Sequence, residues 1–321
     1  MIEKHIILED IDLLSFYGAN NANLQMLKAL YPKLRIVARD NVMRVMGDEA
    51  LIAEFEENVG KLCRHCAQYN QLTEEDIVHI MKGESTRRES TQGVIVYSTQ
   101  GRPITARSKN QQRLVEAFGE KDMVFAIGPA GSGKTYTAIA LAVRALKNKE
   151  VKRIILSRPA VEAGEKLGFL PGDMKDKIDP YLQPLYDALE DMIPAAKLQE
   201  MMEQKVIQIA PLAFMRGRTL NNAVVILDEA QNTTTPQLKM FLTRMGMNTK
   251  MVITGDVTQV DLPHSTMSGL VNALQVLKDI KGISFIHMDK SDIVRHKLVT
   301  QIVEAYEKQP LPYNHLSGTD D

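Results

Sequence analysis

The chain has 321 residues, which is too long for one small domain and is enough for a medium-sized domain with a smaller one beside it. Hydrophobic residues make up 44% and charged residues 25%, an ordinary globular composition that excludes a largely disordered chain. The 39 basic and 40 acidic side chains leave a formal net charge of −1, so the total charge does not indicate a strongly basic nucleic-acid-binding protein.

Membrane and disulfide signals are missing from the sequence. No apolar run reaches the roughly 18 residues of a membrane span, and the first ten residues have no secretory signal. The two cysteines, Cys63 and Cys66, provide no disulfide framework. We therefore expect a cytoplasmic protein that does not enter a membrane.

The first part of the chain predicts a small α+β domain. Leucines recur at helical spacing up to Pro32, and strands are expected at 34–38 and 42–46. A second helix is expected at 51–69, with Asp48 as its N-cap.

The order and size of these elements resemble a KH-type RNA-binding module. Such modules clamp the nucleic-acid backbone with a G-x-x-G loop, and Gly18-Ala19-Asn20-Asn21 supplies only its first glycine. A small α/β interaction domain without an RNA role is the alternative.

One cysteine motif lies inside the second helix. Cys63-Arg64-His65-Cys66 has C-x-x-C spacing, but a zinc site needs two more ligands, and a thioredoxin-like motif would follow a strand. We interpret these as ordinary helix residues.

Charge divides the chain into segments. Residues 1–84 carry 9 basic and 14 acidic side chains, residues 85–110 carry five and one, and residues 111–321 carry 25 of each. The basic stretch is rich in Ser, Thr, Gln and Gly, which predicts a linker. It is either a solvated connector or an electrostatic arm that lies along a polyanion.

Beyond residue 110, apolar runs alternate with helical patterns, which predicts a parallel sheet flanked by helices. The expected strands are 123–127, 153–157, 206–209, 223–227, 251–254 and 283–287. The sequence therefore predicts four parts: a domain at 1–84, a linker at 85–110, an α/β domain at 111–309 and a flexible tail at 310–321.

Residues 128–135 match the phosphate-binding pattern G-x-x-x-x-G-K-[ST] in full, between an expected strand and an expected helix. The predicted nucleotide-binding residues are Gly128, Pro129, Ala130, Gly131, Ser132, Gly133, Lys134, Thr135 and Tyr136. Backbone N–H groups of such a loop surround phosphate oxygens. Lys134 is expected to reach the β and γ phosphates, and the Thr135 hydroxyl to ligate Mg²⁺.

A second motif supplies carboxylates. The apolar run 224–227 ends in Asp228 and Glu229, at the carboxyl end of a buried strand. Asp228 is expected to hold Mg²⁺, directly or through water. Glu229 is expected to orient and deprotonate the attacking water, which favours hydrolysis over simple binding.

Two further strands lead into polar residues, at 157–159 and 255–259. Because ligands of open parallel sheets bind outside the carboxyl ends of the strands, we expect all these segments to meet at one crevice.

Taken together, the phosphate-binding loop, Asp228-Glu229-Ala230-Gln231-Asn232 and Gly255-Asp256-Val257-Thr258-Gln259 resemble the nucleotide-binding lobe of superfamily 1 helicases. The longer strings at 157–162, 167–172 and 214–219 resemble the PhoH family of ATPases. The N-terminal module points to its PhoH-like (PhoL/YbeZ) branch. The resemblance runs from about Asn20 to Gln309 and implies a RecA-like P-loop NTPase lobe behind a KH-like domain.

The resemblance also implies roles for two glutamines. Gln111, or its neighbour Gln112, would read the adenine edge, and Gln259 would sense the γ phosphate. Alternatively, Gln111 and Gln112 are plain helix-start residues and Gln259 is a turn residue.

A superfamily 1 motor closes two lobes over ATP, but about 210 residues remain after residue 110, enough for one lobe. The transition-state arginine must then come from a late segment or from a neighbouring subunit. Arg295 is the first candidate and Arg216 and Arg218 are the next, while a structural arginine paired with Asp292 is the alternative for Arg295. An arginine acting between subunits implies a ring, and hexamers are expected from the resemblance.

These inferences combine into a Mg²⁺-dependent ATPase that acts on or beside RNA. The resemblance implies RNA metabolism, with ATP and Mg²⁺ as cofactors and a YbeY-type endoribonuclease as a partner. One alternative is a nucleotide-switched scaffold that binds RNA or protein, hydrolyses slowly and does not unwind. A P-loop kinase for a small molecule is the other, and Glu229 and Gln259 argue against it.

Overall fold

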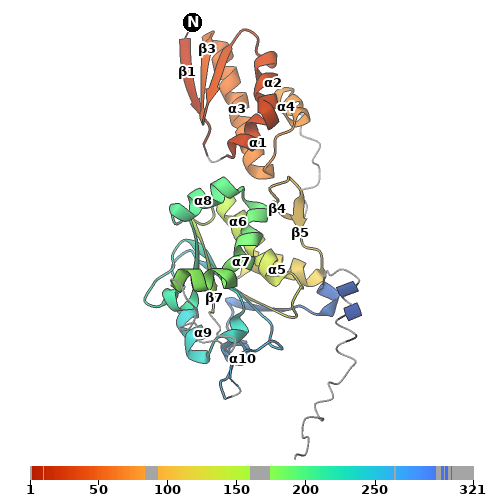
Figure 1. The fold of residues 1–321 in the computed structure, drawn as a ribbon, viewed down its shortest axis with the longest axis vertical. Helices are drawn as coiled ribbons and strands as arrows, with labels where there is room; N and C mark the ends of the chain where they lie inside the picture. The colour runs from red at the N-terminus through yellow and green to blue at the C-terminus, as the bar shows by residue number, and fades with distance from the viewer. Residues whose placement is uncertain are drawn as a thin grey trace, which may run out of the picture.

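The computed structural model describes residues 2–9, 11–83, 93–159, 174–263, 265–293, 298–299, 301–302 and 305, with the backbone alone at 174–180. These residues form a small N-terminal unit and a larger unit that follows it (Figure 1).

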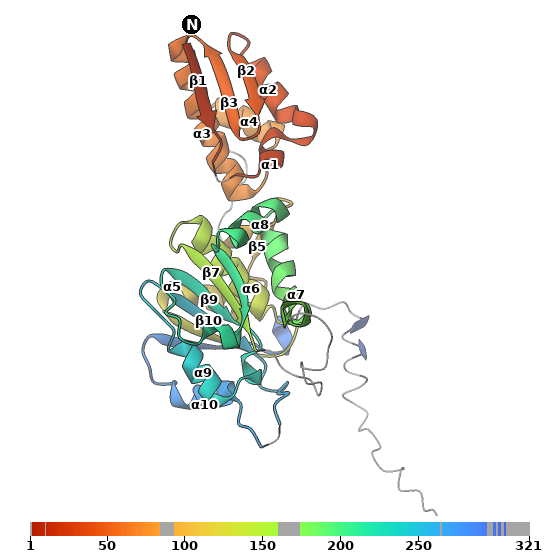
Figure 2. The ribbon, with the colours of Figure 1, turned by 60° about the vertical axis from the view of Figure 1, so that its left-hand side comes forward.

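The N-terminal unit is a three-stranded antiparallel sheet with helices on one face (Figure 2). Its elements are β1 (Ile2–Ile7), α1 (Leu13–Tyr17), η1 (Ala19–Asn21), α2 (Ala22–Leu30), β2 (Arg35–Arg39), β3 (Val42–Gly47), α3 (Glu49–Tyr69) and α4 (Glu74–Met81). The strand order is β1-β3-β2. Alternate strand residues such as Ile36, Met43 and Val45 face a core that also contains Phe16 and Phe55.

Local sequence signals explain this unit well. The side chain of Asp48 caps α3 by accepting a hydrogen bond from the Ala50 N–H, as predicted. The 21 residues of α3 present an apolar stripe to the sheet.

A hairpin of β4 (Val94–Tyr97) and β5 (Pro103–Thr105) follows. It occupies part of the stretch for which we predicted a linker; residues 84–92 of that stretch lie outside the described residues. The β-branched run Val94-Ile95-Val96 explains the strand, because these side chains favour extended backbone and are largely buried here.

The larger unit contains a six-stranded parallel sheet in the order β11-β6-β10-β9-β7-β8. Its elements are α5 (Lys109–Glu120), β6 (Met123–Ile127), α6 (Lys134–Lys147), β7 (Arg153–Arg158), α7 (Met174–Met192), α8 (Ala195–Glu203), β8 (Ile207–Pro211), η3 (Leu212–Met215), β9 (Ala223–Leu227), η4 (Ala230–Asn232), α9 (Thr235–Leu242), β10 (Lys250–Gly255), α10 (Gly269–Val276), β11 (Ile283–His287) and η5 (Lys290–Asp292). The expected fold class, α/β with a RecA-like P-loop lobe, is confirmed.

Both faces of this sheet are covered, which explains why its central strands are apolar throughout. Every residue of β6 and β9 is buried. Helices α5, α6, α7 and α8 pack on one face, and α9 and α10 pack on the other. All six strands point the same way, so the segments that follow β6, β7, β9 and β10 meet at one edge, which we call the carboxyl edge. No helix in the described part of the chain is both long and apolar enough to cross a bilayer.

Candidate nucleotide site at the carboxyl edge

The phosphate-binding loop joins β6 to α6, as the sequence predicted. Gly133 lies just before α6 with a φ of 81°, and no side chain caps the helix. A Cβ at this position would also lie 2.6 Å from Nε2 of Gln111, so only glycine fits without strain. The first N–H groups of α6 therefore point out of the helix end, where they can bind an anion.

Lys134 is directed back at its own loop. Its Nζ donates to the carbonyl oxygen of Pro129 at 2.8 Å, and the Ser132 hydroxyl donates to the same oxygen at 2.8 Å. Burial lowers the pKa of Lys134, and the nearby carboxylates of Asp256, Glu229 and Asp228 oppose this shift. A bound phosphate would give the buried ammonium group a better partner than a backbone carbonyl.

Asp228 directly follows β9. Its Oδ1 accepts a hydrogen bond from the Thr135 hydroxyl at 2.6 Å and another from the Thr254 hydroxyl at 2.6 Å. These contacts bring the loop, β9 and β10 together at the carboxyl edge.

The oxygen atoms around Asp228 fit a hard divalent cation. Oδ2 of Asp256 and Oγ of Ser157 are buried and have no hydrogen-bond partner among the described residues. Carboxylate and hydroxyl oxygens are the ligands that Mg²⁺ prefers, and it commonly completes its shell with water and substrate phosphates. Thr135 and Asp228 thus form a donor set that fits Mg²⁺.

Glu229 is held on both sides. Its Oε1 lies 3.0 Å from Nη2 of Arg158, and its Oε2 accepts a hydrogen bond from Nε2 of Gln231 at 2.5 Å. Oε1 of Gln231 in turn accepts from the Asp256 N–H at 3.0 Å, which connects Glu229 to the segment after β10. The Glu229 backbone is left-handed, with a φ of 53°.

The structure gives Gln111 a contact with the loop. This side chain is buried; its Nε2 donates to the Ser132 carbonyl oxygen at 2.9 Å and its Oε1 accepts from the Arg107 N–H at 2.7 Å. The neighbouring Gln112 is exposed. Both ends of the Gln111 amide therefore bind backbone in this state.

A polar cavity of about 440 Å³ lies beside the first turn of α5. Its lining residues are Arg107, Ser108, Lys109, Asn110, Arg113, Asp289, Ser291 and Asp292. Asp292 is buried and accepts hydrogen bonds from the Asn110 side chain and the Asp289 N–H. The lining residues Ser108, Lys109 and Asn110 directly precede Gln111, whose side chain contacts Ser132 of the phosphate-binding loop.

Two other predicted residues lie close to the carboxyl edge. Gln259 has an exposed side chain in the turn after β10. Tyr136, in the first turn of α6, donates its hydroxyl hydrogen to the Asp191 carboxylate. Burial and this hydrogen bond raise the pKa of Tyr136.

Among the described residues, neither Arg216 nor Arg218 forms an ion pair with Asp228 or Glu229. Nη2 of Arg218 donates to Oε1 of Gln208, in the second residue of β8 and away from the carboxyl edge. Arg216 follows η3. Arg295 lies outside the described residues.

Arg158 lies beside both carboxylates; we expected its segment, 157–159, at the crevice but did not name it as a candidate arginine. It is the last residue of β7, and its side chain contacts Glu229 and approaches Asp228. The rule that polar residues at strand ends form the site placed this segment there, but it did not indicate which side chain would contact Glu229.

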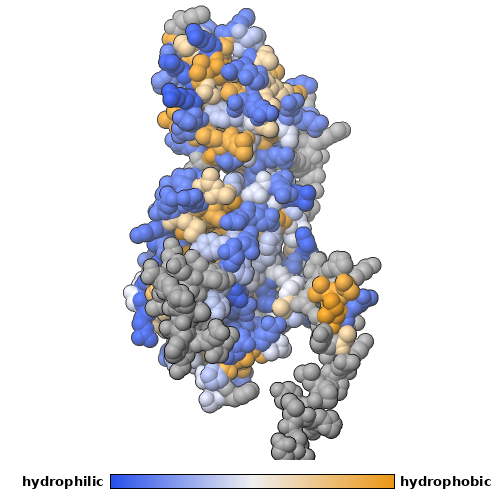
Figure 3. Space-filling model, viewed as in Figure 1, coloured by the Kyte–Doolittle hydropathy of each residue, from blue (hydrophilic) through white to orange (hydrophobic). Residues whose placement is uncertain are grey.

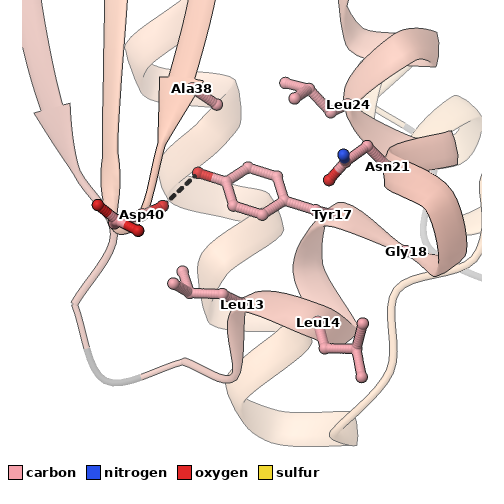
Figure 4. A pocket seen from close by; sticks show the side chains of 8 residues that line it. All are labelled: Leu13, Leu14, Tyr17, Gly18, Asn21, Leu24, Ala38 and Asp40. Carbon is pink, nitrogen blue, oxygen red and sulfur yellow. Dashed lines mark hydrogen bonds between the residues drawn. The ribbon is translucent and has the colours of Figure 1, made fainter.

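The N-terminal unit has a groove beside its incomplete G-x-x-G sequence. Gly18-Ala19-Asn20-Asn21 connects α1 to α2, and three of its residues have a positive φ. The groove has a volume of about 330 Å³ and is lined by Leu13, Leu14, Tyr17, Gly18, Asn21, Leu24, Ala38 and Asp40 (Figure 4). The Tyr17 hydroxyl donates to the Asp40 backbone carbonyl at 3.0 Å, which closes one side.

Cys63 and Cys66 lie within α3, the helix in which the sequence placed them. Burial raises the pKa of Cys63 to about 11 and that of Cys66 to about 12, so both are neutral thiols at neutral pH. The described residues contain no group of three or more His, Cys, Asp or Glu that could hold a metal.

Asn70 and Lys147 connect the two units. Lys147 is the last residue of α6, and its Nζ donates to Oδ1 of Asn70 at 2.7 Å and to the Ala67 carbonyl at 3.2 Å. The Asn70 Nδ2 donates to the backbone carbonyls of Tyr97 and Met192. The helix that begins at the phosphate-binding loop thus ends on the C-terminal end of α3.

Comparisons with known proteins identify the family of the chain. The family model described as "PhoH-like protein" matches residues 103–307. The PhoH-like protein of Bacillus subtilis (strain 168) is 47% identical over 303 residues, covering 93% of this chain and 95% of that protein. The PhoH-like protein of Mycobacterium tuberculosis (strain ATCC 25618 / H37Rv) is 47% identical over 305 residues, covering 94% and 86%.

Similarity to solved structures is lower. The Pif1 helicase from Candida albicans is 13% identical, with a TM-score of 0.35, over 64% of this chain and 44% of that one. The family match spans most of the chain and contains the whole carboxyl edge of the sheet. The chain belongs to the PhoH family and has its P-loop nucleotide-binding fold.

Proposed function

We propose that the chain is a Mg²⁺-dependent ATPase whose hydrolysis is coupled to RNA. The observation that carries this proposal is the pairing of Thr135 in the phosphate-binding loop with Asp228, directly beside Glu229. A metal-binding hydroxyl, a metal-binding carboxylate and a candidate general base then lie at one helix N-terminus.

Each residue has a role in this reaction. Lys134 would leave the Pro129 carbonyl for the β and γ phosphates, and Thr135 and Asp228 would hold Mg²⁺. A cation held there would supply positive charge to the phosphates. Glu229 would take a proton from the water that attacks the γ phosphorus, while ADP carries away the electrons of the broken P–O bond. Gln259 would sense the γ phosphate.

The polar cavity beside α5 is the proposed place of the adenine base. Its lining includes the residues just before Gln111, which contacts the phosphate-binding loop. The lining offers hydrogen-bond donors and acceptors, Ser108 and Asn110 among them. Gln111 itself would act on the position of the loop.

The groove of the N-terminal unit supports the RNA part of the proposal. Leu13, Leu14 and Leu24 give it apolar walls, and Leu14 is 73% exposed. Sequence-specific RNA modules bind single strands whose bases are unstacked and inserted among side chains. A groove next to the loop that resembles G-x-x-G fits such a strand.

The assembly is also a proposal. Each chain would supply one lobe, and Arg295 would act on the nucleotide of a neighbouring subunit. Such a contact repeated around a closed ring gives the proposed hexamer. A YbeY-type endoribonuclease is the proposed partner in RNA metabolism.

The contact between Lys147 and Asn70 favours a second candidate, the nucleotide-switched scaffold. It connects the helix of the phosphate-binding loop to α3, so a nucleotide could change the N-terminal unit without any unwinding. Strand displacement on a short RNA duplex separates a helicase from this scaffold.

The function is tested by phosphate release from Mg²⁺-ATP with and without single-stranded RNA. We expect RNA to stimulate phosphate release by the wild type. The groove variant Leu14→Asp should keep the turnover seen without RNA and lose only the stimulation. Leu30→Asp is the matched control, because Leu30 is also an exposed leucine of this unit but does not line the groove. RNA that neither binds nor changes turnover would contradict the RNA part.

A further inference from the structure

The guanidinium group of Arg158 lies between three acceptors. Nη2 is 3.0 Å from Oε1 of Glu229, Nε is 3.9 Å from Oδ2 of Asp228, and Nη1 donates to the Tyr181 carbonyl at 2.8 Å. The side chain is only 21% exposed. A largely buried guanidinium is thus fixed between the end of β9 and α7.

This contact matters for Glu229 because, among the described residues, the carboxylate has one other side-chain hydrogen-bond partner, Gln231. Glu229 follows a strand in a left-handed conformation, which non-glycine residues adopt at an energetic cost. Its carboxylate is oriented by Arg158 on one oxygen and by Gln231 on the other. Each oxygen can still accept a further hydrogen bond from water.

The shape of the side chain suits this task. A guanidinium group is planar and presents donors in fixed directions, so it can bind a carboxylate and a backbone carbonyl at the same time. A lysine ammonium at this position would keep the charge but not this fixed geometry.

We propose that Arg158 is the positioning residue for Glu229 during ATP hydrolysis, an inference that rests on the proposed ATPase function. Arg158 holds the Glu229 carboxylate so that one lone pair faces the attacking water. It acts through Glu229, and it supplies an arginine at this site from within the same chain.

The test compares ATP affinity with single-turnover phosphate release in wild type, Arg158→Ala, Arg158→Lys, Glu229→Gln and the Arg158→Ala/Glu229→Gln double variant. A misoriented general base slows chemistry, so Arg158→Ala should hydrolyse about 100-fold more slowly. Its ATP affinity should stay within about threefold of wild type. Arg158→Lys should give an intermediate rate, and it carries the test if Arg158→Ala fails to fold.

The double variant separates positioning from direct phosphate contact. If Arg158 acts only through Glu229, the double variant should be no slower than Glu229→Gln, because residues that act as a unit are non-additive. If the double variant were slower than the wild type by the product of the two single-variant factors, the proposal would be overturned.

Arg153→Ala is the matched control. Arg153 begins the same strand, and its Nη2 donates to the Asn221 carbonyl at 3.0 Å, so it makes a similar contact at the other end of β7. Its hydrolysis rate should stay within about twofold of wild type. Normal turnover in Arg158→Ala would overturn this inference alone, whereas a wild type that binds ATP and releases no phosphate would overturn the proposed function as well.

Discussion

At the scale of single residues, the site is defined by side chains that make two contacts each. Asp228 accepts two hydroxyl groups on one oxygen, and Gln111 binds backbone through both ends of its amide. Such a side chain fixes the relative position of two segments. Truncating such a side chain to alanine should therefore change the position of the segment that it contacts as well as its own.

Gln111→Ala tests this for the phosphate-binding loop. Loss of the hydrogen bond to the Ser132 carbonyl should weaken ATP binding by about tenfold. The preference for ATP over GTP should persist, because the side chain holds the loop. Nucleotide titration monitored by fluorescence measures both quantities.

Gln112→Ala is the control for this prediction, since Gln112 is the exposed neighbour on the same helix. It should bind ATP as the wild type does. If Gln111→Ala instead bound ATP about tenfold more weakly and no longer preferred ATP to GTP, the role of Gln111 in reading adenine would be supported.

Contiguous motifs explain what the sequence could predict at this scale. Lys134 and Thr135 lie in one loop, and Asp228 and Glu229 end one apolar run, so spacing alone indicated their roles. The pairing of Arg158 with Glu229 joins residues 71 positions apart in the sequence. Such a contact depends on β7 and β9 being neighbours in the sheet, which no local pattern specifies.

At the scale of elements, α6 joins the phosphate-binding loop to the N-terminal unit. The strands of the sheet were predictable because buried parallel strands are long apolar runs. The β4–β5 hairpin was not, because its short strands lie in a stretch dominated by polar and basic residues. The contact of α6 with the end of α3 was not predictable either, since it is made by a half-buried lysine, Lys147, that no local pattern marks.

The titration of Lys147 should make the stability of the protein depend on pH. Burial lowers the pKa of Lys147 to about 8, against about 10.4 for an exposed lysine. The unfolded state therefore binds more protons between these values, so stability should rise with pH across the window from about 8 to about 10.4.

Urea unfolding of the wild type and of Lys147→Met, at several values across this window, measures the effect. The variant has no group to titrate, so the wild type should gain stability relative to it as the pH rises. Parallel pH profiles of the two proteins would contradict the assignment.

At the scale of the whole molecule, a path of contacts leads from the nucleotide site to α3, which packs against α1, and α1 contributes Leu13, Leu14 and Tyr17 to the groove. The path runs from the phosphate-binding loop through α6 to Lys147 and Asn70, and from there to α3. Coupling between sites requires an element whose state both sites affect. Asn70 is the place to interrupt it, because its side chain also binds Tyr97 and Met192 backbone carbonyls.

Asn70→Ala should uncouple the two units. ATP binding and RNA binding, measured separately, should stay near wild-type values, whereas RNA should no longer stimulate phosphate release. Asn58→Ala is a control in α3, where the Asn58 side chain donates to the Tyr31 hydroxyl within the N-terminal unit. Stimulation that survives in Asn70→Ala would show that coupling takes another route.

The most direct test of the central claim is single-turnover hydrolysis of Mg²⁺-ATP by the wild type and by Glu229→Gln. If Glu229 is the general base, the variant should bind ATP as tightly as the wild type and release phosphate at least about 100-fold more slowly. A variant that hydrolyses ATP at the wild-type rate would contradict the claim that Asp228 and Glu229 form a hydrolytic centre.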